Sequence, residues 1–376
     1  MKKLLIATAV SAAFAAPTLA LAQAARAPTL SQVLDASGIN VSGYLDAGYS
    51  YANRNVEGGG FSDRVFDAQN NSFALHQFGL QVAKQPTRGF GGVVNITVGS
   101  DAQVIHSFPE ATASTFDLTQ AYGQYAMGSL TLMAGKFVTL AGSEVIWSPS
   151  NNNFSHSILF GAIPFTHTGV RAGYAVSDIV TLYGGINNGW DQLTDANKGK
   201  TIELGATIIP IKPLTINVTG YFGQESAGAK GAPAPAPVAQ DQRQLLNVVA
   251  TYTINNRMSA GGEILSVTQD RPAGSAKYNG LAGYFTYNLN REWRVAARAE
   301  MFDDKNGFHF APAAPFATSD TKYKEVTATL AYLPNSSVEL RGEIRGDQAN
   351  NAVFRNSDGS TAKTLQTLAF QGIYRF

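Results

Sequence analysis

Charged side chains of opposite sign alternate along two segments of the chain, residues 292–300 and 339–345. Every second residue in each segment is apolar or Gly, and most of those between are Arg or Glu. Because side chains alternate sides along a strand, each segment carries its charges on one face. Such a face around water either sets up a transverse field that selects solutes by charge or simply makes the wall polar. Glu292 lies beside the predicted wall charges, which are Arg171, Glu203, Glu263, Arg294, Arg298, Glu300, Glu325, Glu339, Arg341, Glu343 and Arg345.

The segment Ser155-His156-Ser157 is the best candidate for nucleophilic chemistry. A serine nucleophile needs a base that a third group orients, and adjacency in sequence does not supply that geometry. A lipid hydrolase is therefore the weak alternative, and hydrogen bonding within a loop is the expected use of these residues. His76 and His167 stand alone without metal-ligand spacing, and we find no phosphate-binding, dinucleotide or zinc motif. We expect no enzyme, cofactor or metal site.

The elements that position these residues are strands with two different faces. Apolar and polar residues alternate with period two in segments of about ten residues, which is typical of half-exposed strands. The pattern predicts sixteen strands, at residues 41–52, 73–84, 90–99, 117–126, 130–138, 168–176, 179–187, 200–209, 214–223, 242–254, 258–268, 278–289, 292–302, 322–333, 337–346 and 364–376.

The connectors between these strands are by turns long and short, which is typical of transmembrane barrels. A soluble sandwich would bury the apolar faces, whereas a membrane barrel turns them to lipid. A sandwich domain has about 100 residues, but here all the strands follow without a linker. Aromatic residues also gather on the apolar face at the short-turn ends, namely Tyr252, Tyr287, Trp293, Tyr332, Tyr374 and Phe376. We therefore predict an all-β, closed antiparallel transmembrane β-barrel of about 16 strands, with short periplasmic turns and long extracellular loops.

The amino end is predicted to be a secretory signal peptide, residues 1–24. Lys2 and Lys3 precede an apolar run that ends at the Ala22-Gln23-Ala24 cleavage site. A membrane anchor helix fits less well, because Pro17 interrupts the run and no basic flank follows. Residues 25–39 form an N-terminal lead-in, which is either a short helical tether or plug or a flexible segment. The barrel is predicted to span residues 40–376.

Composition supports a barrel in lipid. Only 15% of residues are charged, whereas about 25% is usual for soluble domains. The chain has no cysteine, so its stability comes from elsewhere than disulfides. Removing the signal peptide leaves 26 of the 28 basic residues against 27 acidic ones, a net charge of −1. That balance gives no reason to expect a nucleic-acid partner.

One long connector, residues 140–166, is too apolar for a loop in water. It holds several large apolar side chains together with Glu144, Trp147, Asn151, Asn152 and Asn153. We expect it to fold into the lumen and narrow the pore. A subunit contact and a lipid-facing lip are the alternatives. The connector 225–240 is rich in Ala and Pro and is expected to be a disordered outer loop.

Several segments resemble the OmpL-like family of outer-membrane β-barrel porins. The resemblance rests on residues 42–51 (SGYLDAGYSY), 116–122 (FDLTQAY), 134–137 (AGKF) followed by Glu144, 151–174 (NNNFSHSILFGAIPFTHTGVRAGY) and 188–200 (NGWDQLTDANKGK). Beyond Gln240 the likeness is mainly one of strand rhythm. The family implies an outer-membrane pore without naming a solute. The terminal Tyr374-Arg375-Phe376 is similar to the signal that barrel-assembly machinery reads.

The expected function is a porin that passes small hydrophilic solutes by passive diffusion across the bacterial outer membrane. The runner-up is a structural or adhesive barrel with a closed lumen. The expected partners are outer-membrane lipids, the barrel-assembly machinery and the solutes themselves. A homotrimer is expected only by analogy with general porins.

Overall fold

The structure is a computed structural model that describes residues 34, 36–54, 63–109, 114–195, 197, 199–226, 240–270, 274–310 and 320–376. The chain divides into two units, residues 1–38 and residues 39–376. In the first unit, Leu34, Ala36 and Ser37 are helical, and the Ser37 hydroxyl donates to the Leu34 carbonyl over 2.8 Å. The predicted signal peptide, and nearly all of the lead-in, lie outside the described residues.

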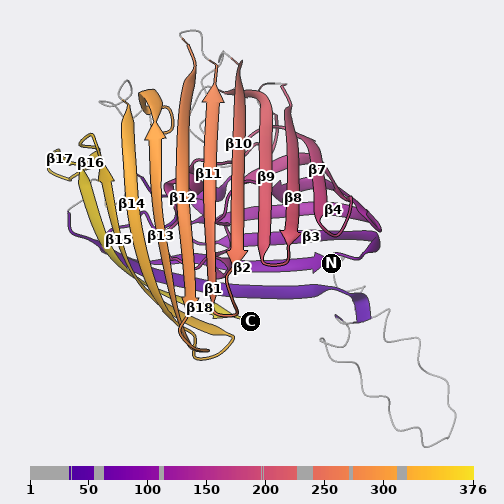
Figure 1. The fold of residues 1–376 in the computed structure, drawn as a ribbon, viewed down its shortest axis with the longest axis horizontal. Coiled ribbons are helices and arrows are strands. Elements are labelled where there is room, and N and C mark those ends of the chain that lie inside the picture. Colours follow the sequence, from indigo (N-terminus) through magenta and orange to yellow (C-terminus); the bar gives the residue numbers. More distant parts are fainter. Residues whose placement is uncertain are drawn as a thin grey trace, which may run out of the picture. The chain divides into compact units, whose positions relative to one another are not determined.

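The second unit is a closed barrel (Figure 1). Its sixteen strands in the described residues are antiparallel neighbours in chain order, and the first strand pairs with the last to close the ring. They are β1 (Asn40–Ala52), β2 (Ser72–Lys84), β3 (Arg88–Val98), β4 (Phe116–Met127), β5 (Leu130–Val138), β6 (Thr166–Ala175), β7 (Val180–Asn187), β8 (Thr201–Ile211), β9 (Leu214–Ser226), β10 (Gln240–Thr253), β11 (Met258–Gln269), β12 (Ala276–Asn288), β13 (Trp293–Asp304), β14 (Thr321–Tyr332), β15 (Val338–Ala349) and β18 (Thr364–Arg375).

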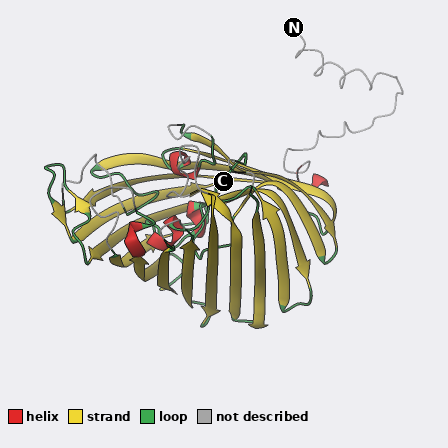
Figure 2. Ribbon diagram, turned by 90° about the horizontal axis from the view of Figure 1, so that it is seen from above, coloured by secondary structure: helices red, strands yellow, loops and turns green. Residues whose placement is uncertain are grey.

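The remaining elements are short and belong to the connectors. They are α2 (Ala102–Ile105), η2 (Ser148–Ser150), α3 (Ile158–Gly161), η3 (Lys305–Gly307) and the two-stranded sheet of β16 (Phe354–Arg355) and β17 (Thr361–Ala362). Figure 2 shows the short helices within the outline of the strands, and α3 contacts β12 and β13. No helix in the described part of the chain is long and apolar enough to cross a membrane.

The barrel is apolar outside and polar inside. Along β14, the buried positions include Glu325, Thr327 and Thr329, while the exposed positions between them include Val326 and Leu330. Val326 is 64% exposed, which would be costly in water and is favourable in hydrocarbon. This inverted burial distinguishes a membrane barrel from a soluble sandwich, and it confirms the fold class predicted from the sequence.

Asparagine closes three of the short turns in the same way. The side-chain oxygens of Asn255, Asn290 and Asn335 each accept hydrogen bonds from two backbone N–H groups, two and three residues further on, over 2.8–3.0 Å. An Asn side chain can thus replace a backbone acceptor where a hairpin reverses. The sixteen predicted strands match the observed ones within three residues at every end.

Candidate functional site

The connector between β5 and β6, residues 139–165, crosses the interior of the barrel, and we refer to it as the inner loop. Near its start, the Leu140 N–H donates to the hydroxyl of Tyr221 on β9 over 2.9 Å. Further on, the ring of Trp147 lies 4.9 Å from that of Tyr44 on β1. The inner loop therefore reaches inward-facing side chains of strands on well-separated parts of the wall.

Arg298 of β13 is the centre of the contact between the wall and the inner loop. Its side chain is fully buried, and its Nε donates to Glu325 Oε1 over 2.7 Å. Its Nη1 donates to Glu144 Oε1 over 2.7 Å and to the Ser155 carbonyl over 2.6 Å. A guanidinium taken out of water must be paired with an anion and hydrogen-bonded. Here one carboxylate from the wall, Glu325, and one from the loop, Glu144, pair with Arg298.

Two wall glutamates hold the inner loop through its backbone. Glu343 accepts from the N–H groups of Phe154 and Ser155 over 2.7 and 2.9 Å. Glu300 accepts from the N–H groups of Ile158 and Leu159 at the start of α3, over 2.7 and 3.2 Å. These N–H groups have no partner within the helix, so a carboxylate there satisfies them.

Two arginines of β15 hold loop carbonyls in the same manner. Arg341 donates to the carbonyls of Asn151 and Asn153 over 2.6 and 3.0 Å. Arg345 donates to the carbonyl of His156 over 2.6 Å and pairs with Asp347 over 2.7 Å. The alternating Arg and Glu of β13 and β15 thus match successive carbonyls and N–H groups of the inner loop.

Glu144 lies within the inner loop and is buried. Burial raises the pKa of its carboxyl, but the guanidinium of Arg298 and the hydrogen bond from the Ser157 N–H outweigh that cost and hold the pKa below its usual range. The Ser157 hydroxyl in turn accepts from the Phe160 N–H over 3.0 Å and caps α3. Glu144 therefore stays ionised and joins two parts of the loop.

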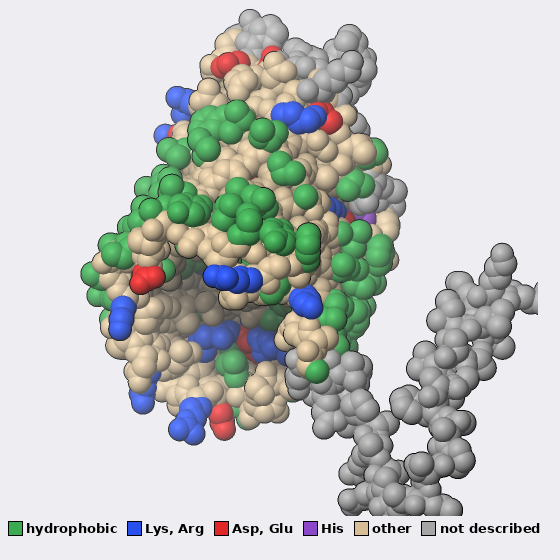
Figure 3. All heavy atoms as spheres, turned by 90° about the vertical axis from the view of Figure 1, so that its right-hand side faces the viewer, with side chains coloured by type: hydrophobic (Ala, Val, Ile, Leu, Met, Phe, Trp, Pro, Cys, Tyr) green, Lys and Arg blue, Asp and Glu red, His purple; other side chains and the backbone are tan. Residues whose placement is uncertain are grey.

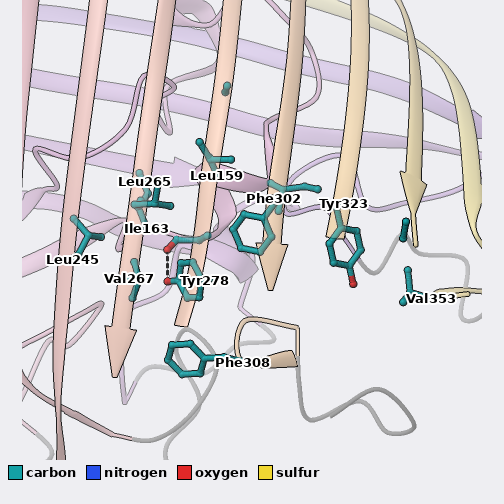
Figure 4. Packing of buried hydrophobic residues seen from close by; sticks show 14 of the residues in the cluster. Leu159, Ile163, Leu245, Leu265, Val267, Tyr278, Phe302, Phe308, Tyr323 and Val353 are labelled. Carbon is teal, nitrogen blue, oxygen red and sulfur yellow. Dashed lines mark hydrogen bonds between the residues drawn. The ribbon is translucent and has the colours of Figure 1, made fainter. Parts of the chain in front are cut away.

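The apolar side chains of the inner loop pack on the inward face of the wall (Figure 4). Leu159 and Ile163 lie among Leu265, Tyr278 and Phe302, and the Tyr278 hydroxyl donates to the Ala162 carbonyl over 2.6 Å. Gly280 of β12 makes room for this contact, since a Cβ there would lie 2.5 Å from Leu159 Cδ1. This packing explains why so apolar a connector does not face water.

The connector between β1 and β2 also folds against the inner loop. The Phe66 ring packs edge-on against Phe160, and Arg64 pairs with Asp67 and Asp347, each over 2.7 Å. Asp63 is buried 3.8 Å from Arg345, and neither of its carboxylate oxygens has a hydrogen-bond partner within the described residues. Burial and the nearby Asp347 raise the pKa of Asp63 to about 7, against the opposing effect of Arg64 and Arg345.

The predicted wall charges all point inward, but they do not lie open to a wide channel. Ten of them are at most 6% exposed, and Arg294 is partly buried. Glu292 is exposed in a turn. Arg171 and Glu203 form a separate bidentate pair on β6 and β8, with hydrogen bonds of 2.5 and 2.7 Å. Glu263 accepts from the Ser143 N–H of the inner loop over 3.0 Å.

The predicted loop residues divide into buried and exposed ones. Asn151 and Asn153 are buried, and the Asn153 amide donates to Thr329 Oγ1 over 2.7 Å. Trp147 is half-buried, and Asn152 is exposed. Sequence reasoning missed several wall residues that bind the loop, among them Tyr221, Asn247 and Tyr278. The available signal was that each carries a polar group at an inward position of its strand.

The serine and histidine at positions 155–157 hold the loop together. Ser155 Oγ accepts from Arg298 Nη2 over 3.0 Å, while His156 Nε2 lies 3.1 Å from the Asn151 amide. Among the described residues, no hydrogen bond joins Ser155 Oγ to His156. In the described part of the chain, no cluster of His, Asp and Glu is arranged to hold a metal ion.

Space remains beside the inner loop. A cavity of about 200 Å³ lies between the loop and β10–β13, and its lining includes Ser143, Asn152, Thr251, Ser259 and Tyr284. Figure 3 views the molecule from the side on which β1 begins in Figure 1 and shows a hollow with Lys and Arg side chains along its edge and inside it. Hydrophobic side chains cover the outer surface around this hollow.

A family model described as "Putative beta-barrel porin-2, OmpL-like" matches residues 38–376, nearly the whole barrel. The chain belongs to this family. This porin is an outer-membrane protein, as its family and its lipid-facing wall agree. No curated protein matches the sequence.

Solved structures similar to this OmpL-like porin are outer-membrane barrels. Pseudomonas putida OprB aligns with a TM-score of 0.64 at 12% identity, covering 92% of this chain and 96% of that chain. An anion-selective porin from Comamonas acidovorans gives 0.63 at 10% identity, covering 90% and 99%. Trimeric OmpT of Vibrio cholerae gives 0.61 at 11% identity, covering 90% and 99%. At sequence identities this low, the similarity shows that the fold is shared and nothing further.

Proposed function

We propose that this porin passes small hydrophilic solutes by passive diffusion and that the inner loop is its constriction. The observation that carries the proposal is the attachment of the inner loop across the lumen by Arg298, Glu300, Arg341, Glu343 and Arg345. A sixteen-strand barrel is too wide for side chains alone to fill, so a fixed loop sets the width of the water path. In this role most of the predicted wall charges position the constriction, and Asn152 faces the solute.

Conductance of the purified protein in planar bilayers tests this function. Discrete, ohmic conductance steps are expected, because a fixed loop leaves a permanently open path. The runner-up is a structural or adhesive barrel with a closed lumen, and it predicts no channel at any voltage. Swelling of liposomes in small sugars or amino acids gives an independent readout of the same path.

We infer that the porin performs no hydrolysis, because Ser155 and Ser157 are engaged in holding the loop. A hydrolase that used either serine would lose lipid turnover in Ser155→Ala or Ser157→Ala. We expect no turnover in the wild type, measured with phospholipid vesicles. Turnover that these substitutions abolish would contradict the inference.

We propose that the porin forms a homotrimer through the outer face of β3–β7. A groove of about 680 Å³ lies there, and Gly123 and Gly184 on its floor have open space where a Cβ would stand. A tryptophan at Gly123 should fill the groove and shift native trimers to monomers in detergent. Gly283→Trp, at an equally open glycine on another part of the wall, is the control. Wild-type monomers would contradict the trimer.

We propose that Tyr374 and Phe376 form the signal for the barrel-assembly machinery. Both rings are exposed on the outer wall, where Phe376 stacks on Phe78 with 6.1 Å between centroids. Deleting Phe376 should lower the amount of folded protein in the outer membrane several-fold, as measured by heat-modifiable gel mobility. Tyr252→Ala, an aromatic of the same girdle away from the terminus, should leave that amount nearly unchanged.

A further inference from the structure

The short-turn end of the barrel carries an excess of positive charge. Five cations are exposed in or beside its turns, and none of them forms an ion pair with any described residue: Lys84, Arg88, Lys212, Arg257 and Arg291. The exposed side-chain carboxylates at the same turns are Asp178 and Glu292. At 0.01 M salt the Debye length is about 30 Å, so exposed charges of neighbouring turns act together and give this rim a positive potential.

Just inside this rim, three guanidiniums surround one carboxylate. Glu339 at the start of β15 is fully buried, and it pairs with Arg294 of β13, Arg341 of β15 and Arg375 of β18. The Arg341 Nε lies 2.7 Å from Glu339 Oε1. One carboxylate balances one guanidinium, so the cluster keeps two uncompensated positive charges.

Those two charges face water. The side chains of Arg294 and Arg375 are 15% and 28% exposed, whereas that of Arg341 is 1% exposed and holds the inner loop. Arg375 Nη2 also lies 3.5 Å from the Pro149 carbonyl, so the cluster borders the inner loop itself. The Nε of Arg294 is buried and has no hydrogen-bond partner among the described residues, so the exposed part of this guanidinium is its outer end.

We propose that Arg294 and Arg375, with the ring of turn cations outside them, bind small anions that carry a carboxylate or phosphate group. A guanidinium fork matches two oxygens of such a group, and this geometry distinguishes it from a lysine. This pair of arginines lies beside the proposed constriction, and rings of like charge at a constriction determine the ion selectivity of a channel. The inference deepens the proposed function and rests on it, since it assigns anions as the class of solute that the porin favours.

The central test is the zero-current potential of single channels in a tenfold KCl gradient at low ionic strength. The wild type should favour chloride over potassium. In the double variant Arg294→Gln/Arg375→Gln, the permeability ratio should fall at least about twofold, because two charges near the path are removed. Lys322→Gln/Lys324→Gln removes the same charge from the outer face of β14 at the long-loop end and should leave the ratio unchanged.

The charge-conserving double variant Arg294→Lys/Arg375→Lys separates a built site from a general field. Acetate and phosphate should reduce the chloride current of the wild type at lower concentration than that of this variant, while both keep their preference for chloride. Equal inhibition in the two proteins would overturn the site. Wild-type channels without anion preference, or a preference that the Gln pair leaves intact, would overturn the inference while the porin function stands. Absence of any channel would overturn the porin function itself.

Discussion

The inward faces of β13–β15 and of β7–β9 arise from the same alternation of side chains along each strand. Their side chains nevertheless differ in charge, in burial and in what they bind. On β13–β15 the inward side chains are charged, buried and bonded to the inner loop. On β7–β9, Thr181, Thr207 and Asn217 share the inward face of Glu203 and are only half-buried. There the Thr207 hydroxyl donates to the Asn217 side chain over 2.7 Å, from one strand to the next.

This difference shows that strand alternation determines which side chains enter the lumen but not what they meet there. A wall of arginine and glutamate beside a loop with free backbone groups becomes a binding surface for that loop. On β7–β9 the inner loop is held only near its start, by Thr219 and Tyr221 of β9, and the half-buried Thr181, Thr207 and Asn217 beyond that contact stay available to water. The water path should therefore run nearer the neutral wall than the charged one.

Arg298→Ala should have the largest effect, because it leaves Glu144 and Glu325 buried without their cation. Breaking a buried pair from one side costs about 3–5 kcal/mol. We expect a lower unfolding midpoint and a larger, noisier single-channel conductance as the inner loop loosens. Arg257→Ala, at an exposed arginine in a turn, is the control for losing one positive charge and should change neither the midpoint nor the noise.

Glu343→Gln should have an intermediate effect, because an amide can accept only on its oxygen where the carboxylate accepts on both. One of the N–H groups of Phe154 and Ser155 would then lose a bond to a charged acceptor, which costs about 1.5–3 kcal/mol. Denaturant unfolding measures the loss, with Glu292→Gln in an exposed turn as the reference. A midpoint that matches the reference would show that the charged wall does not hold the loop.

The buried Asp63 should make the loop contact sensitive to pH. Its pKa of about 7 in the folded protein lies above the value of about 4 in an unfolded chain, so folding favours the protonated form. Its contribution is complete below pH 4 and is lost as the pH rises through 7. The lowered pKa of Glu144 acts in the opposite sense and only in acid. Unfolding midpoints measured from pH 5.5 to 8.5 should fall in the wild type relative to Asp63→Asn, and parallel curves would contradict this account.

Thr207→Ala should have the smallest effect. The side chain is half-buried and, among the described residues, bonds only to Asn217, so the loss of stability should stay below about 0.5 kcal/mol. Channel noise should not change, because no hydrogen bond in the part of the chain that the structure describes joins Thr207 to the inner loop. A destabilisation as large as that of Glu343→Gln would abolish the distinction between the two walls.

The barrel could be predicted from sequence because period-two patterning and turn chemistry are local. The strand ends, the inward charges of β13 and β15 and the unusual character of residues 140–166 all follow from residues close in the chain. The burial of those charges could not be predicted. It depends on which carbonyl of the inner loop meets which guanidinium, and Arg341 and Asn151 lie 190 positions apart. The connector that brings Asp63 and Arg64 to β15 escaped notice for the same reason.

The roles of Glu144 and Asn152 illustrate this limit. Both stand in the predicted constriction segment, and both are polar. Only the fold shows that Glu144 is buried against Arg298, whereas Asn152, eight residues further on, is exposed. Tertiary hydrogen bonds, rather than residue type, separate the buried residue that joins loop and wall from the exposed one.

The most direct test of the central claim uses the absence of native cysteine in the chain. Asn152→Cys places a single thiol on the exposed part of the inner loop, and Val326→Cys places one on the lipid-facing wall as the control. A bulky charged methanethiosulfonate added to open channels should reduce the single-channel conductance of Asn152→Cys and leave that of Val326→Cys unchanged. If the thiol at position 152 is modified, as mass spectrometry would show, while the conductance stays the same, the inner loop is not the constriction.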